Sequence, residues 1–174
     1  MPDEQKTAAF ENVKDQMGYC GIWCGSCVVG NGALTELTRQ YKYLVKAYGL
    51  DHWAPGDVDW NAFYRSLDSV AAVQVCVGCR KGGGRDDCEM RACATSKGLE
   101  ECVACGDDRT CKHAGILEHM RSGAAAVGLF VKEDAADRRS LIDKWTGELR
   151  KRWPCCVLFA PAAPEPTPRH GDKR

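Results

Sequence analysis

The sequence predicts a mainly α fold: a small helical domain whose loop-rich middle segment is organised by cysteines and metal. Three observations support this prediction. Apolar residues recur at helical spacing in several segments, no alternating β/α pattern is present, and seven of the 12 cysteines lie between Cys76 and Cys111. The chain has 174 residues, which is enough for one domain with a hydrophobic core. We therefore expect a single domain over residues 1–159, followed by a disordered, proline-rich tail over 160–174.

Four long helices are predicted, over residues 4–17, 32–49, 59–73 and about 133–152. The second is strongly amphipathic, and Gly49 is expected to stop it. The third carries Trp60, Phe63 and Leu67 on one face. In the last helix the inward side chains are expected to be Leu141, Ile142, Trp145 and Leu149.

The composition limits the classes of partner. The 24 basic and 24 acidic residues balance, so the total charge predicts no attraction to nucleic acid or to acidic membranes. Residues 1–16 are polar, unlike a signal peptide, and no run approaches the roughly 18–20 apolar residues of a membrane helix. We therefore expect a soluble cytoplasmic protein that binds neither membranes nor nucleic acid. Disulfides are rare in that compartment, and cysteine pairs at short spacing more often hold a metal there.

Ten cysteines between residues 20 and 111 form the candidate metal site. They include three C-x2-C pairs, in CGSC, CVGC and CVAC, and such a turn brings two thiolates within reach of one ion. The segment from 76 to 111 has many glycines and few large apolar residues, so it needs cross-links or metal in order to fold. The expected ligands are Cys20, Cys24, Cys27, Cys76, Cys79, Cys88, Cys93, Cys102, Cys105 and Cys111.

The identity of the metal and the pairing of the ligands stay open at this point. Two tetrahedral zinc sites would use eight thiolates, and one [4Fe–4S] cluster with one zinc ion would use the same number. Pairs spread over about 90 residues favour structural zinc with two ions, whereas the C-x3-C-x2-C run from Cys20 to Cys27 favours an iron–sulfur cluster. If EMRACATSKG forms a short helix, five residues turn it by about 140°. Cys88 is then expected just before the helix and Cys93 within it.

These motifs resemble a known family. YCGIWCGSC, CVGCR, CEMRACATSKGLEECVAC and a closing cysteine are similar to the pattern of the domain of unknown function 3795, a cysteine-rich family of bacteria and archaea. The resemblance spans residues 19–111 and implies a metal-binding role in a prokaryotic, often anaerobic, setting, but it implies no reaction. There are two departures from the pattern. Met90 stands where the family usually has isoleucine, and GDDRTC replaces the usual tyrosine–proline–cysteine at Cys111.

Other residues have simpler interpretations. His113 is expected to be a surface histidine at a helix start, and Trp23 is expected to cover the sulfurs. Residues 81–85 lack the pattern of a phosphate loop and are expected to be a flexible spacer. The adjacent Cys155 and Cys156 are expected to be buried structural cysteines. The basic run on the last helix is expected to form a solvated face, favoured by the helix dipole.

The leading hypothesis is a binding or adaptor module for a protein partner, folded around structural zinc that cysteine thiolates hold. No acid–base or nucleophile constellation accompanies the cysteine pairs, so no catalytic residue is expected and an enzyme is not favoured. One alternative is an iron–sulfur protein in electron transfer or redox sensing. Another is an enzyme with an open metal position or a reactive thiolate such as Cys20 or Cys156. C-x3-C-x2-C also occurs in radical S-adenosylmethionine enzymes, but the helical remainder does not fit their β/α barrel.

Overall fold

A computed structural model describes residues 2–54, 56–106 and 110–152. This part of the chain is helical and contains no strand, which confirms the mainly α class. Its α-helices are α1 (Pro2–Val13), α2 (Ala33–Ala47), α3 (Leu50–Trp53), α4 (Trp60–Ala71), α5 (Glu89–Ser96), α6 (Ala114–Ala126) and α7 (Arg138–Arg152). Three single-turn 3-10 helices are η1 (Cys24–Ser26), η2 (Cys79–Lys81) and η3 (Cys102–Ala104). No helix of the described ranges is long and apolar enough to cross a membrane.

The amphipathic helices α2 and α4 lie close to their predicted positions, and α5 covers most of the short helix considered for EMRACATSKG. Helix α7 begins at Arg138, five residues later than predicted, because the Asp137 carboxylate accepts a hydrogen bond from the backbone N–H of Ser140 at 2.8 Å and caps the first turn. Helix α1 ends earlier than expected, and the sequence did not predict α3 or the extent of α6. The proline-rich tail, Cys155 and Cys156 lie outside the described residues.

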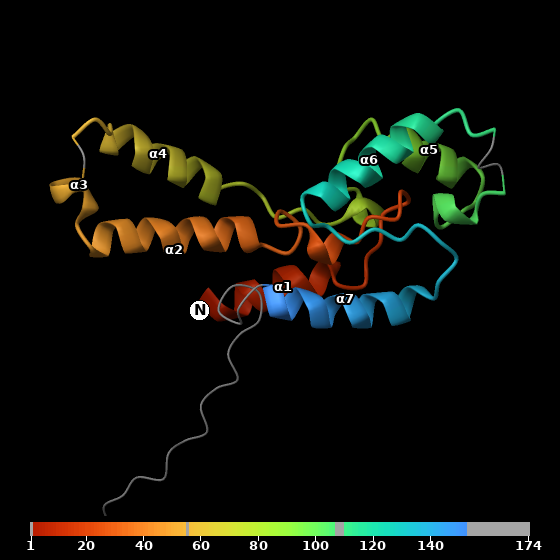
Figure 1. The fold of residues 1–174 in the computed structure, drawn as a ribbon, viewed down its shortest axis with the longest axis horizontal. Helices are drawn as coiled ribbons and strands as arrows, with labels where there is room; N and C mark the ends of the chain where they lie inside the picture. The colour runs from red at the N-terminus through yellow and green to blue at the C-terminus, as the bar shows by residue number, and fades with distance from the viewer. Residues whose placement is uncertain (1, 55, 107–109, 153–174) are drawn as a thin grey trace, which may run out of the picture.

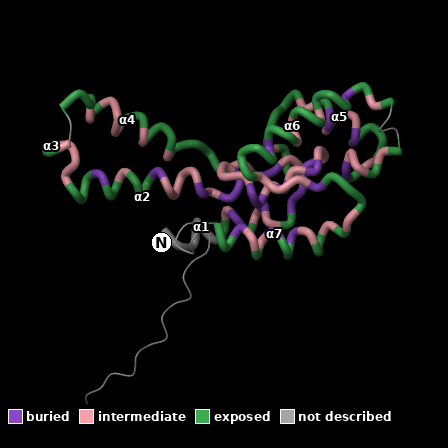
Figure 2. The backbone as a smooth tube through the Cα atoms, in the orientation of Figure 1, coloured by how far each residue is buried: buried purple, intermediate pink, exposed green. Residues whose placement is uncertain are grey.

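Helices α2 and α4 form an antiparallel hairpin that extends away from the rest of the molecule, with α3 at its far end (Figure 1). We call residues 33–71 the helical arm. The ring of Phe63 lies 6.2 Å from that of Tyr41 and 5.5 Å from that of Trp60, measured between centroids. The Asp59 carboxylate caps α4 by accepting a hydrogen bond from the backbone N–H of Ala62 at 2.9 Å. The arm is therefore held by its own aromatic seam, and Figure 2 shows that few of its residues are buried.

The rest of the molecule, which we call the body, has its hydrophobic core around Trp23. The ring of Trp23 is fully buried and contacts the rings of Phe10, Phe130 and Trp145 at centroid distances of 6.2, 5.9 and 6.0 Å. Its indole N–H donates to the carbonyl of Lys14 at 2.6 Å. The expectation that Trp23 covers the sulfurs is therefore corrected, since its ring fills the core between α1 and α7. The core comprises Phe10, Met17, Trp23, Ala33, Ile142, Trp145 and Leu149, which confirms the inward face predicted for the last helix.

A buried ion pair joins the C-terminal part of the body to the cysteine-rich middle. The Lys132 ammonium bonds to the Glu101 carboxylate, and their side chains are only 10% and 8% exposed. The backbone N–H of Lys132 donates to the carbonyl of Gly21 at 2.8 Å, and that of Cys102 donates to the carbonyl of Tyr19 at 2.8 Å. The first cysteine loop, the residues before α7 and η3 are thus tied together at one place.

Candidate metal centre

All ten cysteines expected as ligands are half-buried, and these ten form no disulfide bonds. Each of the three 3-10 helices begins at one of them, at Cys24, Cys79 and Cys102. In η1 and η3 the backbone N–H of the second cysteine of the pair donates to the carbonyl of the first at 3.1 Å. The CGSC and CVAC pairs therefore form single tight turns, which is the local geometry of a chelating loop.

The first cysteine group brings together two pairs that are far apart in the sequence. It comprises Cys24, Cys27, Cys76 and Cys79. Charge on the other three thiols raises the pKa of Cys24. The backbone N–H of Cys79 donates a hydrogen bond to the Cys24 sulfur, which lowers that pKa. A backbone hydrogen bond of 3.2 Å from the N–H of Cys76 to the carbonyl of Val29 holds the second pair beside the first. The sulfur of Cys76 also accepts from the backbone N–H of Gly78 at 3.4 Å.

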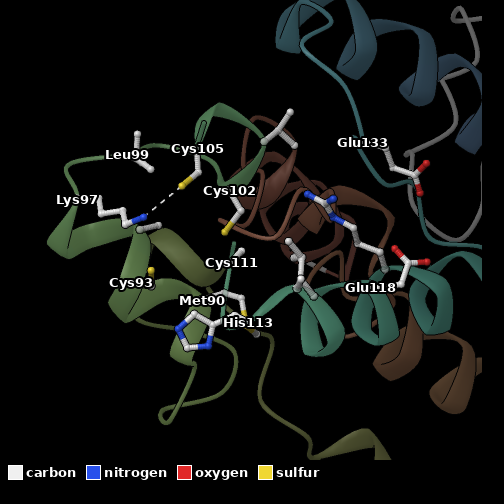
Figure 3. Close-up of a pocket in the computed structure, with 15 residues that line it drawn as sticks. Met90, Cys93, Lys97, Leu99, Cys102, Cys105, Cys111, His113, Glu118 and Glu133 are labelled. Atoms are coloured by element: carbon white, nitrogen blue, oxygen red, sulfur yellow. Dashed lines mark hydrogen bonds between the residues drawn. The ribbon is translucent and has the colours of Figure 1, made fainter. Parts of the chain in front are cut away.

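The second cysteine group lines a cavity of about 320 Å³ between α5, η3 and the start of α6 (Figure 3). It comprises Cys93, Cys102, Cys105 and Cys111. Apolar side chains, among them Met90 and Leu99, form part of the wall. The sulfur of Cys105 accepts a hydrogen bond from the ammonium of Lys97 at 3.4 Å. Four cysteines from three separate chain segments therefore line one partly open cavity.

Cys20 lies between the two groups, and Cys88 lies near Cys20. Charge on the thiols of Cys79 and Cys88 raises the pKa of Cys20, and charge on Cys20 raises the pKa of Cys102. The position that a Cβ atom on Gly18 would occupy lies 3.3 Å from the sulfur of Cys20 and 3.9 Å from the Cβ of Cys79. Cys88 caps the N-terminus of α5 while Cys93 lies inside it, as their spacing predicted.

The electrostatics of the site favour protonated thiols while no metal is bound. Burial raises the pKa of Cys24 and of Cys102 to about 11, and the neighbouring thiols add to the effect. Burial also raises the pKa of Cys20. The guanidinium of Arg121 opposes the rise at Cys102, and its Nε donates to the carbonyl of Cys20 at 2.8 Å. A metal ion that binds here must therefore displace protons from sulfur.

In each group the thiols lie near one another, but they do not form a closed coordination sphere. Among residues 2–54, 56–106 and 110–152, no three His, Cys, Asp or Glu side chains converge closely enough to hold an ion. Side-chain rotation would be needed to bring the sulfurs of one group onto one ion. The donor set itself fits a soft metal, because clustered thiolates select zinc, copper(I) or iron–sulfur clusters over magnesium or calcium.

A family model described as "Protein of unknown function (DUF3795)" matches residues 16–115. The chain belongs to this family. The match confirms the resemblance seen in the cysteine motifs, and its range contains all ten cysteines of the candidate site. No curated protein and no solved structure matches the chain.

The DUF3795 range ends at residue 115, so it contains both cysteine groups and the helical arm but not α7. Trp145 and Leu149 of α7 nevertheless complete the core around Trp23. This DUF3795 protein therefore uses residues outside the family range to cover the apolar side of its first cysteine loop.

His113 is a residue of the site whose environment the sequence did not predict. The expectation of a surface histidine is wrong, because the residue is only 9% exposed. Its Nδ1 lies 2.9 Å from a carboxylate oxygen of Glu89, and its side chain lines the cavity of the second cysteine group. Its position two residues after Cys111 was the available signal, and its exposed partner on α5, Glu89, could not be read from the sequence.

The basic residues that the sequence singled out make contacts of their own. Lys81 bonds to the side-chain oxygen of Asn12, and the Arg91 guanidinium of α5 donates to the carbonyls of Gly83 and Arg85, so the spacer at residues 81–85 is held at both ends. At the end of α7 the guanidinium of Arg152 donates to the carbonyl of Gly128 at 2.7 Å.

Proposed function

We propose that this protein is a small metal-binding module in which cysteine thiolates hold two structural zinc ions, one in each cysteine group. The observation that carries the proposal is that eight thiols lie in two sets of four, the first joining the pairs at residues 24–27 and 76–79 and the second drawn from three segments between residues 93 and 111. Four thiolates match the tetrahedral coordination of structural zinc. Cys20 and Cys88 are additional ligands or bridges to the same sites.

The need for metal follows from how little else holds the middle of the chain. Between residues 76 and 111 the described residues that are more than nine-tenths buried and apolar are Met90 and Ala94. The helices there span three to eight residues, too short to be stable alone. Metal binding supplies folding free energy directly in domains of this kind.

An iron–sulfur cluster is the second candidate. The C-x3-C-x2-C run and the half-buried sulfurs suit a [4Fe–4S] cluster, which also takes four thiolates. Backbone N–H groups that point at sulfur, such as that of Gly78 at 3.4 Å from Cys76, occur in both kinds of site. A thiol-dependent enzyme with Cys20 as its reactive group is a third, weaker candidate.

We further propose that the module binds a protein partner in the cytoplasm. Cysteines without disulfide bonds are typical of a reducing compartment. Tyr43, Tyr48 and Trp53 of the helical arm are each 70% or 71% exposed, and aromatic residues are enriched where proteins meet.

The deciding experiment is to purify the protein without oxygen, record its visible spectrum and count its metals. A colourless protein with two zinc ions per chain is expected. Broad visible absorption with stoichiometric iron would replace zinc by the cluster. A protein that contains neither metal, and that keeps its full structure when a chelator is present, would overturn metal binding altogether.

The raised thiol pKa values give this proposal a pH dependence. Because the pKa of Cys24 and of Cys102 is about 11, both thiols carry protons at neutral pH and must lose them on binding zinc. Zinc affinity is therefore expected to rise as pH increases from about 6 to about 9, with release of protons that a weakly buffered titration detects. An affinity that is flat over this range would contradict thiolate ligation.

A further inference from the structure

The glycine-rich loop at residues 81–85 packs directly against a sulfur of the first cysteine group. A Cβ atom on Gly83 would lie 2.8 Å from the sulfur of Cys76 and 2.9 Å from the backbone nitrogen of Gly78. The backbone N–H of Gly83 donates to the carbonyl of Gly78 at 2.9 Å, so the loop folds back over the CVGC turn. The φ angle of Gly83 lies outside the left-handed region, so it is the close approach to sulfur that requires glycine there.

Arg91 of α5 holds the loop in this position. Its guanidinium donates hydrogen bonds to four backbone carbonyls, those of Cys79 at 3.4 Å, Gly83 at 3.0 Å, Arg85, and Asp86 at 3.4 Å. A guanidinium reaches several acceptors at once because its N–H donors are fixed in a planar fork, which a lysine ammonium does not offer. Arg91 thus joins the backbone of one expected ligand, Cys79, to the loop that covers another, Cys76.

A chelating pair that is held in place beforehand binds an ion more tightly. Ordering side chains and loops on binding costs free energy, and this cost is smaller when the ligands are already positioned. The same loop also holds Gly78, whose backbone N–H donates to the sulfur of Cys76 at 3.4 Å. Loss of a group that orients a metal ligand typically lowers metal affinity by about 10- to 100-fold.

We infer that Arg91 is the positioning residue of the first metal site and acts on Cys76 and Cys79 through the loop at 81–85. This inference rests on the proposed function and deepens it, because it assigns a role in that site to a residue that is not a ligand. Arg91 lies two residues before Cys93 of the second group, on the same helix. Helix α5 therefore contributes to both sites.

The test measures zinc at each cysteine group separately, in variants of the full chain. The zinc-loaded protein is titrated with a competing chelator, and iodoacetamide labelling mapped by mass spectrometry reports which cysteines have lost their metal. In Arg91→Lys and in Gly83→Ala, zinc affinity at Cys76 and Cys79 should fall by about 10- to 100-fold. The cysteines of the second group should stay protected as in the wild type.

The chain offers a matched control for each variant. Arg65→Lys makes the same change at an exposed arginine of α4. Gly123→Ala makes the same change on α6, where no atom lies within 4 Å of the added Cβ. Both controls should keep wild-type zinc affinity at both groups.

The outcomes separate this inference from the proposed function. Arg91→Lys keeps the positive charge but not the fork of donors, so wild-type affinity in this variant would overturn the inference. Wild-type affinity in Gly83→Ala would overturn it as well. Equal loss of protection at both cysteine groups would also overturn it, since Arg91 would then support the whole fold rather than the first site. A wild-type protein without zinc would overturn the proposed function, and this inference with it.

Discussion

The helical arm and the cysteine-rich middle follow each other in the chain, yet they are held together by different means. The arm is built mainly of two helices of 15 and 12 residues that pack through aromatic rings. The middle, residues 76–111, has one helix of eight residues and two single turns, and cysteines supply seven of its side chains. Apolar periodicity accounts for the arm, whereas under the proposed function the neighbouring middle depends on metal bound to its thiols.

The largest expected effect comes from removing one C-x2-C pair. Cys76→Ser with Cys79→Ser should abolish zinc at the first cysteine group and unfold the middle, since structural zinc contributes about 10–16 kcal/mol in small zinc domains. Metal content and the near-ultraviolet circular dichroism of the body check this. Tyr43→Ser with Tyr48→Ser, two exposed changes in the arm, should leave both signals unchanged. Equal losses of zinc and of circular dichroism signal in the two double variants would contradict the proposed difference between the arm and the middle.

The buried ion pair gives the next largest effect. Lys132→Met leaves the Glu101 carboxylate buried without its partner, and should lower the free energy of unfolding by about 3–5 kcal/mol. Adding Glu101→Leu should recover most of the lost stability, because an apolar pair needs no compensating charge. Denaturant unfolding measures both variants, with Lys144→Met on the exposed face of α7 as the control. If Lys144→Met lowered the free energy of unfolding as much as Lys132→Met does, the loss could not be attributed to the ion pair.

A smaller effect is expected at the start of α4. Asp59→Ala removes the cap of that helix and should lower stability by about 1 kcal/mol, with zinc content unchanged. The exposed Asp57→Ala is its matched control and should have no measurable effect. Loss of zinc in Asp59→Ala would show that the arm and the cysteine groups fold as one unit.

The same contrast explains what could be predicted from the sequence. The arm and the inward face of α7 follow from apolar spacing, so Gly49 and Asp59 were found at the ends of their helices and Trp145 at the core. The cysteine motifs predicted which residues gather, and five residues between Cys88 and Cys93 correctly separated them on α5.

What could not be predicted depends on contacts between segments far apart in the chain. The division of the cysteines into two groups depends on backbone bonds such as that from Cys76 to Val29. The pairing of His113 with Glu89, and of Lys132 with Glu101, joins residues 24 and 31 positions apart, for which local spacing carries no signal. Trp23 was assigned to the sulfurs because its neighbours are cysteines, whereas its ring packs on residues of α7 more than 100 positions away.

We propose that metal holds the middle of the chain, whereas apolar packing holds the arm. Hydrogen exchange of the zinc-loaded protein, followed amide by amide before and after a strong chelator is added, tests this most directly. Amides between residues 76 and 111 are expected to lose their protection once the zinc is removed, while those of α2 and α4 keep theirs. Unchanged protection across 76–111 after the zinc has been removed would contradict it.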